Sequence, residues 1–280
     1  FVSMSLIVKG VVSAALFAAG MHLTHSLLWA ALGLLAAWIL TLFVVDLSNA
    51  RGSLGGRRLS LRPRWAPSRQ RALALLALPL GFAALCDSLF VNIPRYFVGA
   101  MLGERQLGIF AAMAYIAIIG VRVVTALGQS ALPRLAKYHQ QRDAVRFRGL
   151  MIKILAVGCL IGAGGIAVAL LAGKELLTLL YRPEYAEDLG AFTWLMAAAA
   201  VNYASVFLGY GMTAAQTFVV QPLIAIIGAL VLAAGCVLWI PAHGLVGVAM
   251  AVTLSAATRF AFNAYSSWRI LDELRRGEKA

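Results

Sequence analysis

Residues 79–115 read PLGFAALCDSLFVNIPRYFVGAMLGERQLGIFAAMAY. This stretch places a carboxylate, Asp87, inside one apolar segment, and Asn92, Pro94 and Arg95 follow it before a second apolar segment begins. An ionisable side chain in the hydrocarbon of a bilayer is energetically costly, so it marks a functional site by default. The composition of the remaining chain tests whether a bilayer surrounds Asp87.

The composition is typical of a polytopic membrane protein. Of the 280 residues, 62% are hydrophobic and 12% are charged, whereas soluble domains are about half apolar and about a quarter charged. A helix that crosses a bilayer needs about 20 mostly apolar residues. Eight such segments lie at 1–20, 26–45, 72–93, 107–129, 150–172, 189–211, 218–240 and 244–266. We expect an all-α polytopic membrane protein with eight transmembrane helices, because these segments are too long and continuous for barrel strands.

Gly158 and Gly162, four residues apart, predict a close helix contact.

Basic residues gather in three regions that share one side of the membrane if the spans alternate. Loop 46–71 carries seven, loop 130–153 carries six, and the tail after residue 266 carries four. The positive-inside rule places all three in the cytoplasm, C-terminus included. The net charge of +13 then follows from topology, and we expect a lipid bilayer rather than nucleic acid as the partner.

Loop 46–71 is also the predicted domain boundary, because it is the longest polar stretch. We expect the last two helices of an N-terminal lobe at 1–45, a basic cytoplasmic linker at 46–71, a six-helix C-terminal lobe at 72–266 and a cytoplasmic tail at 267–280. The chain opens with Phe1 inside an apolar run, which we interpret as a fragment that lacks its N-terminal part. Three dispersed cysteines in apolar runs predict no disulfide framework and no metal site, and we expect no cofactor.

Once the basic residues of the three loop regions are set aside, four charged residues remain inside predicted spans, namely Lys9, Asp87, Arg122 and Arg259. Polar or small neighbours recur at helical spacing. The faces are Gly108, Tyr115, Arg122 and Gln129; Ser255, Arg259 and Asn263; Ser5, Lys9 and Ser13; and Asn202, Ser205 and Gly209. Polar faces on several helices indicate a polar cavity between them.

Simpler interpretations stay open for each charge. Arg122 and Arg259 lie near cytoplasmic helix ends, so snorkelling accounts for them as well as a cavity does. The position of Lys9 depends on where its helix starts. The side chain of Asp87 is too short to snorkel, and it either lines a cavity or makes a structural hydrogen bond. Arg95 either marks a helix end or faces the same lumen as Asp87, about 12 Å further along the helix.

Three features of the opening stretch are shared with one family: Asp-Ser at 87–88, Pro-Arg-Tyr at 94–96, and Leu-Gly followed by Leu-Gly-Ile-Phe within 102–110. With ALPRLAKYHQQRD at 131–143, they resemble polysaccharide-export flippases. These are the O-antigen and exopolysaccharide (Wzx-type) members of the multidrug/oligosaccharidyl-lipid/polysaccharide (MOP) superfamily. The resemblance covers the layout of the whole chain, and its specific motifs lie within about residues 79–143.

The resemblance implies a MATE-like fold of two lobes around a central cavity, with the eight spans as helices 5–12. It also implies a cargo, which is an oligosaccharide linked to undecaprenyl pyrophosphate. The transporter would flip this cargo from the cytoplasmic to the outer leaflet of the bacterial inner membrane by alternating access. Arginine suits a pyrophosphate because its planar fork binds two oxygens. The candidate cavity residues are Arg95, Arg122, Arg259, Lys9, Tyr115 and Asn202, and Asp87 is the candidate site for a coupling cation or proton. Tyr96, Tyr203 and Tyr210 either contact sugar or anchor helix ends at the membrane interface.

Two other functions are compatible with a helical bundle. A multidrug or cation antiporter of the same superfamily favours acidic cavities, whereas the predicted spans hold more bases than acids. A membrane-embedded glycan-modifying enzyme needs a histidine or paired carboxylates near the membrane, and His22 and His25 on a short loop are the one hint of this. We therefore expect a transporter and not an enzyme.

Overall fold

The computed structural model describes residues 2–46, 67–181, 183–217 and 220–278, and it divides into two compact units, Phe1–Pro67 and Ser68–Ala280. Most of the linker predicted at 46–71 lies outside the described residues. Within them, every regular element is helical and no strand occurs.

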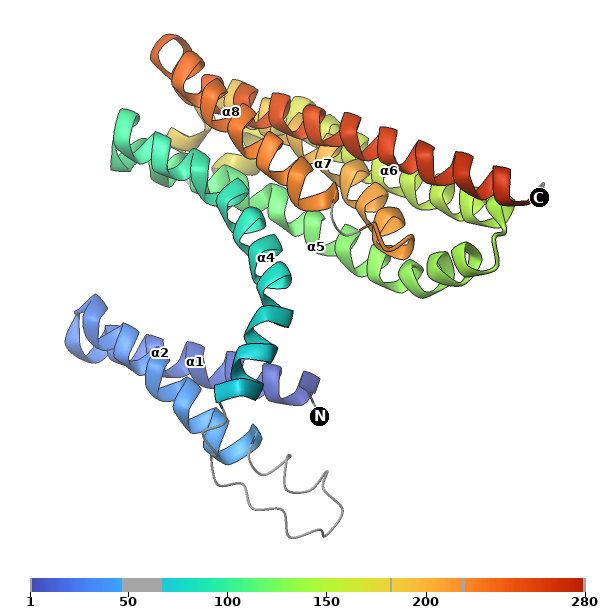
Figure 1. Cartoon of the computed structure of the whole chain (residues 1–280). Helices are drawn as coiled ribbons and strands as arrows, with labels where there is room; N and C mark the ends of the chain where they lie inside the picture. The colour runs from blue at the N-terminus through green and yellow to red at the C-terminus, as the bar shows by residue number, and fades with distance from the viewer. Residues whose placement is uncertain (1, 47–66, 182, 218–219, 279–280) are drawn as a thin grey trace, which may run out of the picture. The chain divides into compact units, whose positions relative to one another are not determined.

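The first unit is a helical hairpin (Figure 1). Its elements are α1 (Val2–Thr24), α2 (Leu27–Thr41) and the π-helical turn η1 (Leu42–Asp46). A Cβ added at Gly20 would lie 2.9 Å from the Ala30 Cα, and one at Gly33 would lie 2.7 Å from the Leu16 carbonyl oxygen. The two helices therefore approach closely because their contact residues are small.

The second unit is a bundle of long helices (Figure 1). Its elements are α4 (Pro67–Leu102), α5 (Glu104–Gln140), α6 (Ala144–Leu180), the 3-10 turn η2 (Pro183–Ala186), α7 (Leu189–Ala214) and α8 (Val220–Glu278). Gly103, with φ of 87°, separates α4 from α5, because this left-handed conformation favours glycine. Asp143 begins α6 by accepting a hydrogen bond from the Arg146 amide (2.8 Å), as a helix N-cap does.

The described residues form seven α-helices rather than the eight predicted. The difference lies in α8, which contains both spans predicted at 218–240 and 244–266. Gly244 has φ of 55° and ψ of −131°, and the helix folds back there into two antiparallel arms. A Cβ added at Gly235 would lie 2.8 Å from the Ala251 Cβ on the other arm. Periodicity predicts these two arms, and the turn at Gly244 separates them within the segment labelled α8.

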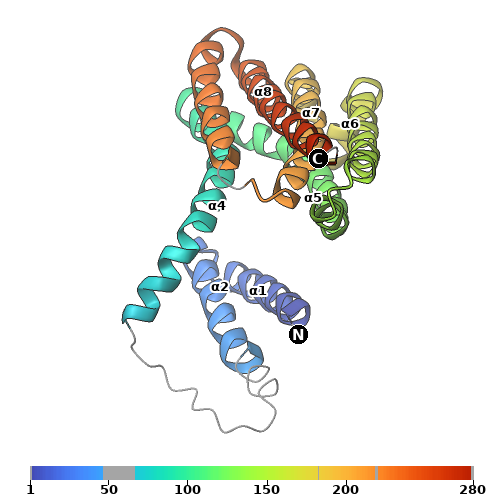
Figure 2. The same cartoon turned by 45° about the vertical axis from the view of Figure 1, so that its right-hand side comes forward.

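Membrane-spanning character is clear from helix length and composition. Five described segments are long and apolar enough to cross a bilayer: Leu27–Val45, Glu104–Gln140, Ala144–Leu180, Leu189–Ala214 and Val220–Arg276. α7 is the central helix of the second unit, since its contacts with α5, α6 and α8 are more extensive than those that these three helices make with one another. Figure 2 shows it between α6 and α8. Its side chains Phe192, Tyr203, Phe207 and Met212 are almost wholly buried.

The predicted close contact at Gly158 and Gly162 occurs between α6 and α7. A Cβ at Gly158 would lie 2.8 Å from the ring of Phe207, and one at Gly162 would lie 2.6 Å from the Ala200 Cβ. Lipid tails are as apolar as the side chains, so helices in a membrane associate through such packing rather than through the hydrophobic effect.

Two tyrosines of α7 join it to α5 in the same way. The Tyr203 hydroxyl donates a hydrogen bond to the Ala117 carbonyl (2.8 Å), and a Cβ at Gly120 would overlap that side chain. About two helical turns further along α7, the Tyr210 hydroxyl donates a hydrogen bond to the Thr125 carbonyl (3.3 Å). The ring of Tyr210 lies over Gly128. We call these two contacts the tyrosine clasps. They set the spacing between α5 and α7.

Replacing Tyr203 with phenylalanine tests the first clasp. Tyr203→Phe keeps the ring but removes the donor, so we expect a loss of about 0.5–1 kcal/mol of stability. Thermal unfolding of the complete purified protein in detergent measures this loss as a lower Tm. Tyr96→Phe is the matched control, because Tyr96 is 70% exposed on α4. Equal Tm values for the two variants would contradict the role of the clasp.

Candidate functional site

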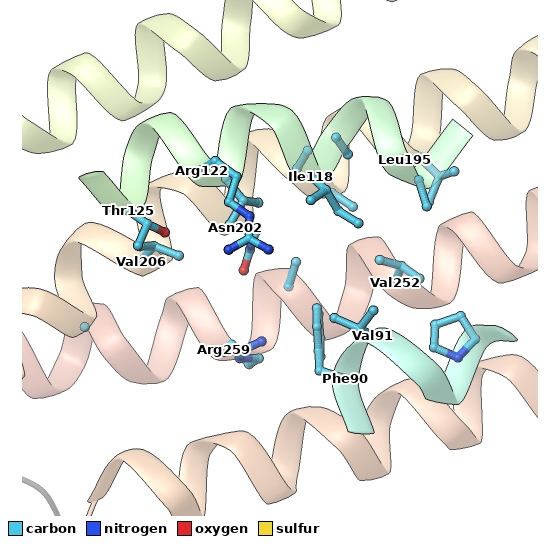
Figure 3. A pocket seen from close by; sticks show the side chains of 18 of the residues that line it. Phe90, Val91, Ile118, Arg122, Thr125, Leu195, Asn202, Val206, Val252 and Arg259 are labelled. Atoms are coloured by element: carbon cyan, nitrogen blue, oxygen red, sulfur yellow. The ribbon is translucent and has the colours of Figure 1, made fainter. Parts of the chain in front are cut away.

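A cavity of about 770 Å³ lies within the second unit (Figure 3). Side chains from α4, α5, α7 and α8 line it. Its volume falls within the range of about 300–1,000 Å³ that is typical of small-molecule sites. The tyrosine clasps hold two of its walls, because Arg122 lies on α5 between Gly120 and Gly128, and Asn202 directly precedes Tyr203 on α7.

The cavity is basic. Its polar and charged lining residues are Arg95, Arg122, Thr125, Asn202, Tyr210, Thr213, Gln221 and Arg259. No acidic residue is among the described residues that line it. In Figure 3, Arg122 enters from α5 and Arg259 from α8. Three guanidinium groups therefore share one space without a carboxylate on its described walls.

Polarity changes along the cavity. On α5 the lining runs from the apolar Phe110 to Arg122 and Thr125, and on α7 it runs from Leu195 to Asn202 and beyond. The polar lining of both helices thus lies toward their C-terminal parts. Gln221 belongs to this polar end, where its amide donates a hydrogen bond to the Thr213 hydroxyl (3.0 Å).

Arg259 is positioned by α4 and by the other arm of α8. Its guanidinium carbon lies 4.4 Å from the centre of the Phe90 ring, a cation–π geometry. A Cβ at Gly228 would lie 2.7 Å from the Arg259 Cγ and Cδ atoms. The missing side chain at Gly228 therefore makes room for the stem of Arg259.

Arg95 and Arg122 occupy different levels of the cavity. The guanidinium carbon of Arg95 lies 5.7 Å from the centre of the Tyr115 ring. Tyr115 precedes Arg122 by seven residues on α5, which is about 10 Å along a helix. The side chain of Arg122 is exposed, and none of the ion pairs among the described residues involves it. Arg95 and Arg122 are thus spread along the cavity.

The structure brings four of the predicted site residues together, namely Arg95, Arg122, Arg259 and Asn202. Tyr115 contacts Arg95 but is not among the lining residues. Lys9 belongs to the first unit, where its ammonium lies 4.4 Å from the centre of the Trp38 ring. Asp87 lies in α4, but its side chain is not among the parts of the chain that the structure describes, so its predicted role stays a prediction.

Some residues of the predicted polar faces hold helices together instead of facing the cavity. The Asn263 amide donates to the Ser205 hydroxyl (2.8 Å), and both residues are buried between α7 and α8. The Ser255 hydroxyl donates to the Gly228 carbonyl (2.6 Å). Tyr203, a candidate sugar contact, is 2% exposed and makes the first clasp. Buried polar groups need partners where water is scarce, and neighbouring helices supply them here.

Sequence reasoning missed several lining residues. Thr213 follows Gly209 by four residues, so extending the predicted face of Asn202 and Gly209 by one turn would have found it. Tyr210, which the sequence already marks as a candidate sugar contact, is a lining residue as well as a clasp. Gln221 and Phe90 carry no local signal, because they reach the cavity from other helices.

Residues 4–189 match the family model described as Polysaccharide biosynthesis protein. The chain belongs to this family. Over 185 residues it is 29% identical to the capsular polysaccharide biosynthesis protein CapF of Staphylococcus aureus. That match covers 66% of this chain and 47% of the relative, so the chain spans about half the length of the curated relative.

Solved structures show that the fold is MATE-like, as the resemblance implied. An inward-facing multidrug resistance MATE family transporter of the MOP superfamily matches 98% of this chain with a TM-score of 0.77 at 12% identity. An outward-facing one matches 98% with a TM-score of 0.71 at 12% identity. The chain covers 64% and 63% of these two proteins. The fold and the apolar helices identify a multi-pass membrane protein.

A third structure is a MOP superfamily transporter from Pyrococcus furiosus. It matches 95% of this chain with a TM-score of 0.65 at 13% identity, and the chain covers 62% of it. Its description states that the reverse polarity of its binding pocket suggests a different function.

Proposed function

We propose that this chain is part of a transporter that flips an undecaprenyl-pyrophosphate-linked oligosaccharide from the cytoplasmic to the outer leaflet. The observation that carries the proposal is the cavity with three arginines and no acid on its described walls. The polysaccharide biosynthesis family and the name of the CapF relative support a glycan cargo. The protein moves its cargo without chemical change, so it is not an enzyme.

The cavity suits an anionic head group with attached sugars. Arg122 and Arg259 supply forked donors for phosphate oxygens. Asn202, Thr213 and Gln221 at the polar end offer hydrogen-bonding groups to sugar hydroxyls. The lipid tail stays in the bilayer, since moving it through a basic cavity would remove it from hydrocarbon. Arg95, beside Tyr115, contacts the anion at a second level.

Transport by alternating access requires the two lobes to rock about the cargo. The similar MATE transporters have been solved facing inward and facing outward, which supports this movement for the fold. In this proposal 1–45 and 72–266 belong to two lobes, and Lys9 contributes to the N-terminal one. Linker 46–71, loop 130–153 and the tail at 267–280 face the cytoplasm of a bacterial inner membrane, by the positive-inside rule.

A cation or multidrug antiporter is the competing function. The basic cavity disfavours it, because cations and guanidinium groups repel one another. The reverse polarity described for the Pyrococcus furiosus pocket supports the view that cavity charge and cargo can differ within this fold.

Removing the cavity charges tests the cargo. In cells that lack the complete protein, Arg122→Gln and Arg259→Gln should each lower glycan export at least about tenfold, because each removes charge-assisted hydrogen bonds to the anion. Surface glycan per cell, divided by the amount of transporter in the membrane, is the measurement. Arg105→Gln is the matched control, since Arg105 is exposed and pairs with Glu184 (3.2 Å) outside the cavity lining. Normal export by the Arg122→Gln/Arg259→Gln double variant would contradict the proposal.

Asp87 is the proposed site of a coupling cation or proton. Asp87→Asn removes the charge while keeping the size, so we expect export to fall to the level of cells without the transporter. The same export assay measures it, with Asp188→Asn in the loop before α7 as the control. If Asp87→Asn cells export glycan at the normal rate, Asp87 has no part in coupling.

A further inference from the structure

The start of α6 and the end of α8 lie near the C-terminus (Figure 1). Residues of these two segments line a second pocket. Its volume is about 240 Å³, and it is lined by Arg148 of α6 and by Trp268, Leu271, Asp272 and Arg275 of α8. It shares no lining residue with the basic cavity. It is therefore a separate site.

Apolar packing fixes the two arginines of this pocket. Phe147 and Leu274 belong to one buried cluster and are 2% and 6% exposed. Arg148 and Arg275 directly follow these two residues in the sequence, and both are exposed. Because the cluster joins the start of α6 to the end of α8, it holds both arginine backbones at the rim of the pocket.

The arginines around the pocket differ in their partners. Arg146 pairs with Asp143 (3.3 Å), and Arg269 pairs with Glu273 (3.9 Å). Asp272, the one acid that lines the pocket, is bound by Arg276 (2.7 Å). None of the ion pairs among the described residues involves Arg148 or Arg275. Two like charges thus face one pocket, and an anion between them would relieve their repulsion.

Aromatic side chains place the pocket at the depth of lipid head groups. Tyr265 and Trp268 are 57% and 61% exposed, and their ring centres lie 6.2 Å apart. Exposed Tyr and Trp near the end of a membrane helix settle at the level of the head groups. Trp268 also lines the pocket, so the pocket opens at that level.

We propose that this pocket binds the phosphate of an anionic phospholipid head group. Arg148 and Arg275 hold the phosphate oxygens with forked hydrogen bonds. Trp268 and Leu271 contact the glycerol and the first carbons of the acyl chains. The proposal does not depend on the cargo of the basic cavity, and it gives the basic tail a defined lipid partner.

Lipid retention by the complete protein tests the proposal. The protein is purified in detergent and titrated with phosphatidylglycerol, and native mass spectrometry measures the apparent Kd of the tightest bound lipid. Arg148→Gln and Arg275→Gln should each weaken that Kd about fivefold, the effect of one basic residue at an anionic surface. Asp272→Asn should tighten it by a similar factor, because it removes the acid and releases Arg276.

Arg146→Gln is the matched control, since Arg146 lies two residues from Arg148 but pairs with Asp143. It should leave the Kd unchanged, and all variants should keep the wild-type Tm. The proposal is overturned if the Arg148→Gln/Arg275→Gln double variant binds phosphatidylglycerol like the wild type. It is also overturned if phosphatidylcholine binds equally well, or if equimolar inorganic phosphate displaces the lipid, which would indicate a site for free anions.

Discussion

The close contact between α5 and α7 determines the geometry of the basic cavity. In hydrocarbon, helices gain little from burying apolar surface against one another, so they depend on close packing and on hydrogen bonds. The clasps provide both, because Tyr203 and Tyr210 lie over Gly120 and Gly128 and donate to carbonyls of α5. Arg122 lies between the two clasps, so its position relative to α7 follows directly from them.

The three arginines line a cavity between helices, where the free-energy cost of a charge is lower than against lipid tails. A charge facing lipid tails is expensive, whereas the three arginines line a cavity together with other polar side chains. Arg259 also gains the face of Phe90 (4.4 Å), and Arg95 gains that of Tyr115 (5.7 Å). These ring contacts help to hold the guanidinium groups of Arg259 and Arg95 in position.

Much of this arrangement is predictable from the sequence. Apolar length predicts the helices. The isolated charges Arg122 and Arg259 are compatible with a cavity or with snorkelling, and the structure places both among the lining residues of one cavity. Spacing alone does not show whether a polar residue faces a cavity or a neighbouring helix. Ser205 and Asn263 have the same spacing as lining residues, but they pair with each other. Contacts between distant helices, such as the approach of Gln221 to Thr213, depend on packing that no local pattern encodes.

In the proposed function, the basic cavity recognises the charge of a pyrophosphate head group. The most direct test is the affinity of the complete purified protein for undecaprenyl pyrophosphate and for undecaprenol, which has the same tail but no phosphate. We expect the wild type to bind the pyrophosphate lipid at least about tenfold more tightly than undecaprenol, because the loss of one charged hydrogen-bonded contact weakens binding by about that factor. We also expect the Arg122→Gln/Arg259→Gln variant to lose most of this preference. Equal affinity of the wild type for the two lipids, or an undiminished preference in the variant, would contradict the proposed function.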